Sequence, residues 1–277
     1  MSSHSGAVIE VVKEEQGTFV YKSINDDVPR TVRSLEKQKN FAAIDTIEYK
    51  IQATPINYWQ EPDRLIAKMP YIEGISGAQI SSHGNKALAK NIRLSLNNFF
   101  IDAIANSKEI QISNRIFLDK IDEIRSRPHP LEISESLTAA INWIQSNIQE
   151  TLNIPVGRCH GDLTLSNMII TQSHELYLLD FLDSYIETPL QDAAKIFQDM
   201  IYGWSFRNET SALRLRSQLF CENAFPDYLN ILERIYQREM PIFKLMTVLR
   251  IAPYISDSDQ KTIDWFNRAI KQILGSL

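Results

Sequence analysis

The sequence predicts an α+β protein of two lobes: a small β-rich lobe over residues 1–73 and a mostly helical lobe over residues 74–277. Near the N-terminus, β-branched and aromatic residues alternate with polar ones, which is typical of strands. After residue 74, apolar residues recur at helical spacing over long stretches. A chain of 277 residues is long enough for two lobes that share a core.

The N-terminal lobe is expected to contain a hairpin, one helix and two further strands. Residues 6–24 read AVIEVV, a turn at Glu15–Gly17, and then TFVYKSI, which favours a hairpin. Residues 29–44 follow as a predicted helix, because Pro29 suits a first helical turn. Two short strands are predicted at residues 48–53 and 64–69.

The C-terminal lobe is expected to be helical except for one hairpin. Residues 81–105 form one predicted helix, and almost every segment after residue 193 has a helical pattern. A third helix is predicted where apolar residues share one helical face: Leu137, Ile141, Ile144, Ile148 and Leu152. The exception is residues 167–181, in which two short apolar runs flank the polar turn Thr171–Glu175 and therefore predict two paired strands.

Composition and charge narrow the class of protein. Apolar residues make up 44% of the chain, charged residues 23%, and the net charge is −5, as in ordinary soluble globular proteins. This charge favours neither a nucleic-acid nor an anionic-membrane partner. Two cysteines exclude a disulfide framework and fit a reducing compartment. The N-terminus lacks a secretory pattern and no apolar run could span a bilayer, so we expect a cytoplasmic protein.

The segment CHGDLTLSN at residues 159–167 carries the main chemical signal. The predicted hairpin would bring Asn167, at the start of one strand, beside Asp180, at the end of the other, with Asp162 on the preceding loop. One amide and one carboxylate with open positions left over suit Mg²⁺, which also binds substrate phosphates. A second carboxylate nearby can hold a hydroxyl group for in-line attack. The residues therefore predict phosphoryl transfer.

Three short motifs follow one another in order: HGDLTLSN at residues 160–167, LDF at 179–181 and PLQD at 189–192. Together they resemble the aminoglycoside phosphotransferase and choline kinase group, whose members have the bilobal protein-kinase-like fold. The resemblance extends over residues 6 to about 200. It implies that Asp162 is the catalytic base or the residue that orients the hydroxyl, and that Asn167 and Asp180 bind the metal.

The same resemblance assigns structural and nucleotide-binding residues. His160 and Asp192 are implied as buried supports of the catalytic loop. In the N-terminal lobe, Lys22 stands where the family has the strand lysine that binds the α- and β-phosphates, and Glu36 stands where the family has the helix partner of that lysine. The family's other nucleotide contacts fall on Pro70 and Ile72, as the hinge that receives adenine, and on Gly6, in a short lid over the phosphates.

The function expected from these residues is phosphorylation of a small-molecule hydroxyl group by ATP or GTP with Mg²⁺. The alternative is a non-catalytic nucleotide-binding or regulatory protein of kinase shape, which the short glycine lid favours. Retention of Lys22, Asp162, Asn167 and Asp180 favours the enzyme. A protein kinase is disfavoured, because few residues separate Asp180 from Pro189 to dock a protein substrate.

The C-terminal charge balance bears on the acceptor. Residues 203–277 contain ten basic and eight acidic residues, whereas a polycationic aminoglycoside needs an acidic cleft. We therefore expect a neutral or anionic acceptor, most simply a sugar, a sugar derivative or a polyol. The alternative is that these charges lie on solvated helix faces and do not concern the acceptor. The oligomeric state is not predicted.

Overall fold

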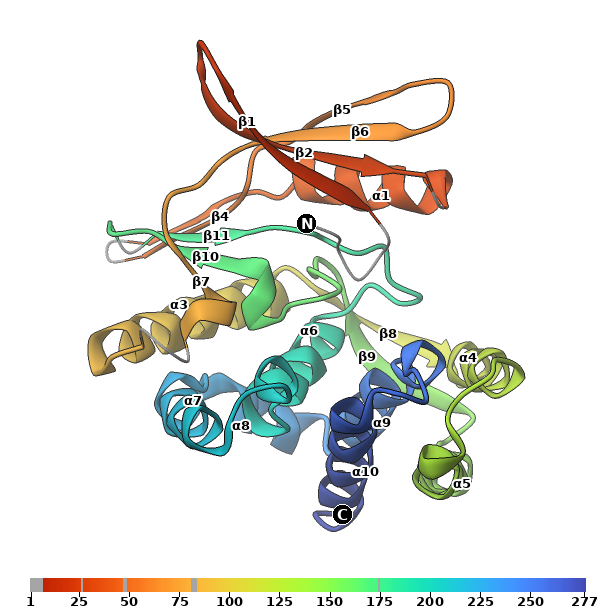
Figure 1. Cartoon of the computed structure of the whole chain (residues 1–277). Coiled ribbons are helices and arrows are strands. Elements are labelled where there is room, and N and C mark those ends of the chain that lie inside the picture. The colour runs from red at the N-terminus through yellow and green to blue at the C-terminus, as the bar shows by residue number, and fades with distance from the viewer. Residues whose placement is uncertain (1–6, 26, 47–48, 81–83, 174) are drawn as a thin grey trace.

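The structure is a computed structural model that describes residues 7–25, 27–46, 49–80, 84–173 and 175–277 (Figure 1). A β-rich N-terminal part lies above a helical C-terminal part, which confirms the predicted α+β class. The two parts meet around the segments that carry the three motifs.

The N-terminal part is built on a four-stranded antiparallel sheet in the order β1-β2-β6-β5. Its strands are β1 (Val8–Glu14), β2 (Gly17–Ile24), β5 (Asn57–Gln60) and β6 (Leu65–Pro70). The predicted hairpin is thus confirmed as β1 and β2. Helix α1 (Val28–Lys39) covers one face of the sheet, and Leu35 of the helix packs with Leu65 and Met69 in a small separate core.

A second sheet joins the two parts of the chain. Its order is β3-β4-β11-β10-β7. The strands are β3 (Ile44–Asp45), β4 (Lys50–Ala53), β7 (Ile75–Ser76), β10 (Met168–Ile170) and β11 (Leu176–Leu178). The predicted hairpin of the helical part is β10 and β11, and β11 pairs in parallel with β4. The motif-bearing hairpin is therefore fixed by hydrogen bonds to strands on both sides of the predicted boundary at residue 73.

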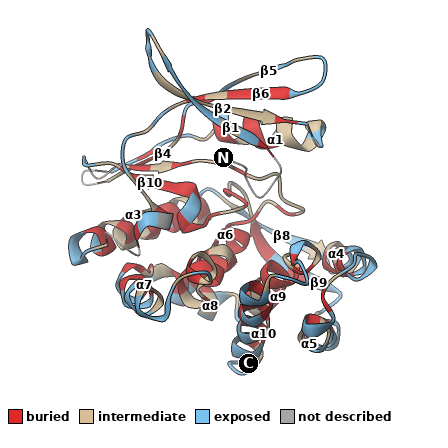
Figure 2. Cartoon of the chain, viewed as in Figure 1, coloured by how far each residue is buried: buried red, intermediate tan, exposed pale blue. Residues whose placement is uncertain are grey.

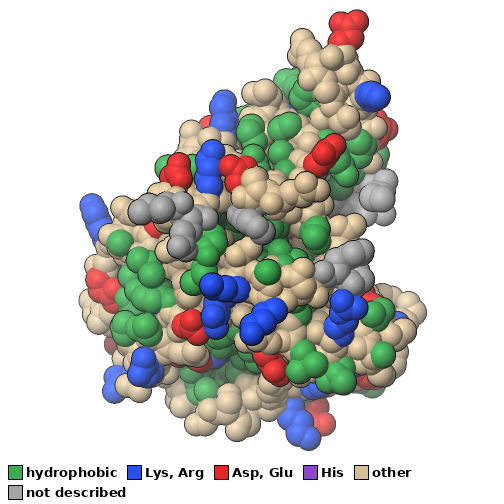
Figure 3. Space-filling model, turned by 90° about the vertical axis from the view of Figure 1, so that its left-hand side faces the viewer, with side chains coloured by type: hydrophobic (Ala, Val, Ile, Leu, Met, Phe, Trp, Pro, Cys, Tyr) green, Lys and Arg blue, Asp and Glu red, His purple; other side chains and the backbone are tan. Residues whose placement is uncertain are grey.

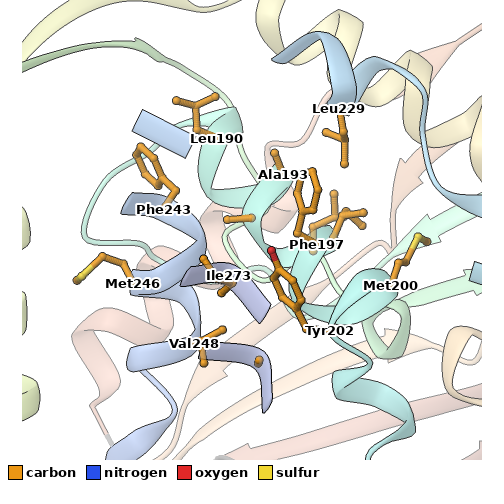
Figure 4. Packing of buried hydrophobic residues seen from close by; sticks show 14 of the residues in the cluster. Leu190, Ala193, Phe197, Met200, Tyr202, Leu229, Phe243, Met246, Val248 and Ile273 are labelled. Carbon is orange, nitrogen blue, oxygen red and sulfur yellow. The ribbon is translucent and has the colours of Figure 1, made fainter. Parts of the chain in front are cut away.

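The C-terminal part packs its helices around α6 (Pro189–Ile196), which is buried along most of its length (Figure 2). The others are α3 (Lys86–Ala105), α4 (Arg115–Ser126), α5 (Ser134–Asn147), α7 (Ser211–Ala224), α8 (Tyr228–Ile235), α9 (Glu239–Leu249) and α10 (Gln260–Leu274). Leu190 and Phe197 lie in the same apolar cluster as Leu229 of α8, Phe243 of α9 and Ile273 of α10 (Figure 4). This core holds α6 in one position beneath the catalytic loop.

The helix predicted over residues 81–105 begins only at Lys86, because the side chain of Asn85 caps it by accepting the N–H of Leu88; residues 81–83 lie outside the described residues. Two other predicted helices extended too far at their C-terminal ends. The helix predicted over residues 29–44 ends at Lys39, because Asn40 caps it and Ile44 pairs with Ile51 as a strand. The helix that carries Ile141 ends at Asn147, and Leu152 lies in a strand, β9 (Thr151–Val156). That strand pairs with β8 (Lys108–Ser113), a hairpin that the helical spacing concealed. Strand pairing decided both ends, with the nearby Ile51 at Ile44 and with the distant Ile112 at Leu152.

The face on which α3 and α7 lie mixes hydrophobic and basic side chains (Figure 3). A shallow pocket there is lined by Lys86, Lys90 and Arg93 of α3 and by Asn223 of α7. Over the described parts of the chain, every helix is too short or too polar to cross a membrane.

Candidate active site

The catalytic loop, residues 159–167, is held by a buried carboxylate. Asp192 on α6 is fully buried, and its Oδ2 and Oδ1 accept the backbone N–H groups of His160 at 2.5 Å and Gly161 at 2.7 Å. Burial raises the pKa of Asp192 to about 7, against the lowering effect of these hydrogen bonds and of Lys37. Gly161 has a φ of 89°, a left-handed conformation that favours glycine. Asp192 thus lies where a support for the loop is expected.

A second buried carboxylate holds the same loop further along, and the sequence analysis missed it. Asp199 lies in the π-helical segment Phe197–Ile201 that continues α6. Its Oδ2 accepts the backbone N–H of Leu165 at 2.6 Å, and its Oδ1 accepts that of Ser205 at 2.8 Å. Burial raises its pKa. The sequence signal for Asp199 was its spacing from Asp192, because two helix residues seven apart lie on one face.

Both ring nitrogens of His160 form hydrogen bonds with backbone groups. Its side chain is fully buried, its Nε2 lies 3.0 Å from the carbonyl oxygen of Leu179, and the N–H of Asp162 donates to its Nδ1 at 3.2 Å. These contacts assign the proton to Nε2. The ring also packs on Phe181, with centroids 4.2 Å apart. Burial lowers the pKa of His160 to about 4, so the imidazole is neutral near pH 7.

This pKa predicts a pH-dependent contribution to stability. The unfolded histidine takes up a proton near pH 6.5 and the folded one near pH 4, so the stabilisation is complete above pH 6.5 and is lost as the pH falls toward 4. Between pH 7 and pH 5, wild type should lose about 2 kcal/mol more unfolding free energy than His160→Gln, which keeps one donor and one acceptor. Urea unfolding at both pH values measures this. Equal losses in the two proteins would contradict it.

Asp162 lies on the loop between two bonded partners. Its Oδ1 is 2.9 Å from Nζ of Lys195, and its Oδ2 accepts from Nδ2 of Asn167 at 3.0 Å. Burial raises the pKa of Asp162, but the charge and hydrogen bond of Lys195 outweigh burial, and the net pKa is lowered. The carboxylate is therefore ionised near neutral pH. Lys195 was missed from the sequence, although it follows Asp192 by one helical turn.

Asn167 and Asp180 are brought together by the β10–β11 hairpin. The N–H of Leu179 donates to the carbonyl oxygen of Asn167 at 3.1 Å, which places Asp180 directly beyond this pair. Asp180 has a φ of 58°, a left-handed conformation that aspartate adopts more readily than most residues. Its Oδ1 lies 2.9 Å from Nζ of Lys22.

The oxygen ligands of Asn167 and Asp180 fit Mg²⁺ better than a metal whose ligands all come from the protein. Among the described residues, no group of three or more His, Cys, Asp or Glu side chains could hold a metal ion. Asn167 and Asp180 offer one amide oxygen and one carboxylate, and Mg²⁺ completes such a set with waters and substrate phosphates.

The structure does not bring Glu36 to Lys22, which corrects the expected pairing. Glu36 instead accepts a hydrogen bond from the hydroxyl of Tyr58 and lies 3.2 Å from Nδ2 of Asn40. The site-facing side of α1 carries Gln38, whose Oε1 accepts the backbone N–H of Asp180 at 3.1 Å. Positions 36 and 38 are two residues apart and point to different sides of a helix. The carboxylate bound to Lys22 is that of Asp180.

The segment after Asp180 is tied to α1 by Lys37. Its Nζ lies 2.5 Å from Oε2 of Glu187 and donates to the carbonyl oxygen of Leu182 at 2.9 Å. Cys159 donates to the same carboxylate of Glu187 at 3.1 Å, and burial raises its thiol pKa well above the ordinary value. Since His160 is bonded to backbone, Cys159 and His160 form no nucleophile–base pair.

Two of the remaining predicted nucleotide contacts, Pro70 and Ile72, lie at the connection between the two parts. Pro70 ends β6 opposite Phe19, and the N–H of the next residue, Tyr71, donates to Thr18 at 2.9 Å. Ile72 follows in the irregular segment that leads to β7. Gly6 lies outside the described residues.

Residues 110–227 match the model of a family described as the phosphotransferase enzyme family, abbreviated APH. The chain superposes on choline kinase LicA from Streptococcus pneumoniae with a TM-score of 0.55 and 16% identity, over 96% of this chain and 90% of that one. The resemblance to this phosphotransferase family is confirmed. The matched segment contains Asp162, Asn167 and Asp180, and also Lys195 and Asp199.

Two further solved structures show the same fold. A thermostable mutant of aminoglycoside phosphotransferase APH(4)-Ia with ADP and hygromycin B has a TM-score of 0.59 and 10% identity, over 97% of this chain and 94% of that one. Amicoumacin kinase hAmiN with AMP-PNP, Ca²⁺ and Ami has a TM-score of 0.56 and 10% identity, over 98% and 86%. The protein-kinase-like fold is thus shared with these phosphotransferases at low sequence identity.

A curated relative covers a smaller region. An uncharacterized protein of Metamycoplasma hominis is 25% identical over 177 residues, which are 62% of this chain and 31% of that protein. The chain therefore spans less than a third of the length of this relative.

Proposed function

We propose that the protein transfers the γ-phosphoryl group of ATP or GTP to a hydroxyl group of a small molecule, with Mg²⁺. The observation that carries the proposal is the grouping of four side chains from three separate segments. Asp162 contacts Asn167, Asn167 adjoins the end of the strand that leads to Asp180, and Asp180 contacts Lys22. This set offers a proton acceptor, two oxygen ligands and a phosphate-binding cation.

In the proposed reaction, the acceptor's hydroxyl oxygen attacks the γ-phosphorus in line with the bond that breaks. That bond joins the γ-phosphorus to the oxygen bridging it to the β-phosphate, and the nucleoside diphosphate leaves with the bond's electron pair. The hydroxyl proton passes to Asp162, whose lowered pKa keeps it ionised and able to hold the hydroxyl group. Mg²⁺ bound by Asn167 and Asp180 would supply positive charge to the phosphate oxygens.

Lys22 would act as the phosphate-binding cation. Its ammonium group lies on β2, in the sheet above Asp180, with only 16% of its side chain exposed. It would bind the α- and β-phosphates while its contact with Asp180 is taken over by the metal. The adenine is proposed to contact the Pro70 carbonyl and the Ile72 amide.

The acceptor is proposed to be neutral or anionic, with a sugar, sugar derivative or polyol as the first class to test. The solved relatives do not point to one acceptor: their names refer to choline, hygromycin B and amicoumacin. Several basic residues of the C-terminal helices are engaged away from Asp162. Lys244 is paired with Glu233, and Arg207 lies over the ring of Trp204. Arg250 is different, because its charge acts on Asp162.

A non-catalytic nucleotide-binding protein is the second candidate. It is favoured by the absence of a Lys22–Glu36 contact among the described residues, since active protein kinases require that ion pair. Both candidates bind nucleotide, so turnover separates them.

The proposed function is tested with purified protein, ATP, Mg²⁺ and a panel of hydroxyl-bearing metabolites, with ADP release as the measurement and mass spectrometry to identify the phosphorylated product. We expect at least one sugar, sugar derivative or polyol to be phosphorylated, and kanamycin-class compounds to be poor acceptors. Nucleotide binding without phosphorylation of any hydroxyl compound would favour the non-catalytic candidate. Efficient turnover of aminoglycosides alone would contradict the proposed acceptor class.

A further inference from the structure

Arg250 carries a positive charge that the described part of the protein leaves uncompensated. The residue caps the C-terminal end of α9 and is partly buried. Its guanidinium carbon lies 5.3 Å from the ring centroid of Tyr185. Its Nη1 is buried without a hydrogen-bond partner, and no described Asp or Glu forms an ion pair with it. A buried guanidinium N–H without an acceptor is costly, and an anion removes that cost.

Other unsatisfied polar groups lie on the elements around this arginine. The hydroxyl of Tyr185 is buried without a partner. Thr247 precedes Arg250 by one helical turn on α9, and its buried hydroxyl is also without a partner. Gln191 is fully buried on α6, which packs against α9, and neither polar atom of its side chain is bonded. Each of these side chains can donate a hydrogen bond.

The uncompensated charge lies close to the reacting groups. Asp162 has Lys195 as its own cationic partner at 2.9 Å, so its charge is already balanced. Arg250 lies at the ring of Tyr185, and the preceding Ser184 adjoins Gly161, where an added Cβ would lie 2.5 Å from the Ser184 hydroxyl oxygen. Arg250 is therefore near the loop that carries Asp162, and its charge also acts on that carboxylate. A ligand held between Asp162 and Arg250 would therefore need a hydroxyl group at one end and negative charge at the other.

We propose that Arg250 binds an anionic group of the acceptor, a carboxylate or a phosphate, while the acceptor's hydroxyl group lies at Asp162. Tyr185 donates its hydroxyl hydrogen to the same group. The acceptor class is thus a hydroxyl compound that bears an acidic substituent, such as a sugar phosphate or a sugar acid. This inference rests on the proposed kinase function. A guanidinium group suits both anions, because its planar N–H donors match the oxygens of either one.

The kinetic test compares matched acceptors in wild type and variants. The acceptors are glucose, glucose 6-phosphate and glucuronate, together with glycerol, glycerol 3-phosphate and glycerate. In wild type, kcat/KM from ADP release should be about 10- to 100-fold higher for the better anionic member of a set than for its neutral member. Arg250→Met should remove most of that ratio, chiefly through KM, and Arg250→Lys should retain part of it. Arg268→Met, at an exposed position of α10, should retain all of it.

A binding measurement keeps the inference testable apart from turnover. Protein saturated with AMP-PNP and Mg²⁺ is titrated calorimetrically with inorganic phosphate. Arg250→Met should weaken phosphate binding by at least about tenfold, and Arg268→Met should not change it. Thermal melting checks that each variant is folded, and Arg250→Lys provides the second variant if Arg250→Met melts early.

The possible outcomes distinguish the anion-binding role of Arg250 from the kinase function. Preference for neutral acceptors, or an equal loss for all acceptors in Arg250→Met, would overturn the anion-binding role while the kinase function stands. An equal loss would assign Arg250 to the transferred phosphoryl group instead. Absence of Arg250-dependent phosphate binding would also overturn the inference. Absence of turnover with every hydroxyl compound, together with intact Arg250-dependent phosphate binding, would overturn the kinase function but support an anion site at Arg250.

Discussion

Asp162→Asn should lower kcat by about 10²- to 10⁴-fold, the usual effect of removing a general base. The asparagine cannot accept the hydroxyl proton. It also removes the negative charge that pairs with Lys195, whose Nζ lies 2.9 Å from Oδ1 of Asp162 in the wild type. Its amide also faces Nδ2 of Asn167, which loses its acceptor at Oδ2. Single-turnover phosphorylation with a competent acceptor, or ADP release, measures the loss.

The control for this variant is Asp264→Asn, at an exposed position of α10 where, among the described residues, the carboxylate bonds only to Gln260 of the same helix. It should have wild-type activity. Nucleotide affinity and melting temperature of Asp162→Asn should stay near wild type, because Asp192 and Asp199 hold the loop from below. Near-wild-type turnover in Asp162→Asn would show that this carboxylate does not receive the proton.

Asp180→Ala should weaken Mg²⁺-dependent nucleotide binding more than Asn167→Ala does, by about tenfold or more, because a carboxylate offers formal charge to Mg²⁺ and an amide only a dipole. The substitution also frees Lys22, which can then bind phosphate without the metal. Nucleotide affinity measured without Mg²⁺ should accordingly fall little or rise in Asp180→Ala.

Calorimetric titration of AMP-PNP with and without Mg²⁺ tests this expectation for both variants. Asn167→Ala serves as the matched comparison, because it removes the other proposed ligand from the same hairpin and leaves the Lys22–Asp180 contact intact. Equal losses of Mg²⁺-dependent affinity in the two variants would argue against the assignment of Asp180 as the principal metal ligand.

Much of the architecture was predictable because its signals are local. Alternation over residues 6–24 predicted the hairpin of β1 and β2, and two apolar runs predicted β10 and β11. The wrong helix ends share one cause. At Ile44 and Leu152, strand pairing determined the conformation, with Ile51 in the first case and Ile112 in the second, and helical spacing carries no information about such a partner.

The residues of the candidate site also fall into two groups: those that the sequence predicted and those that the tertiary structure placed. By itself, the sequence determined the three motifs and the neighbourhood of Asp162, Asn167 and Asp180, because one loop and one short hairpin within residues 162–180 connect them. The partners of these residues were decided only by the tertiary structure. Lys22 reaches Asp180 across 158 positions of sequence, through the packing of a sheet above a hairpin.

The same reason explains what was missed and what was misassigned. Glu36 was chosen from its place along α1, but the rotation of that helix against the sheet turns Gln38, and not Glu36, toward Asp180. Lys195 and Asp199 project from one buried helical segment onto the catalytic loop, and Arg250 comes from another helix. Which side of a helix faces a site depends on how its apolar residues pack, and that packing is a property of the whole core.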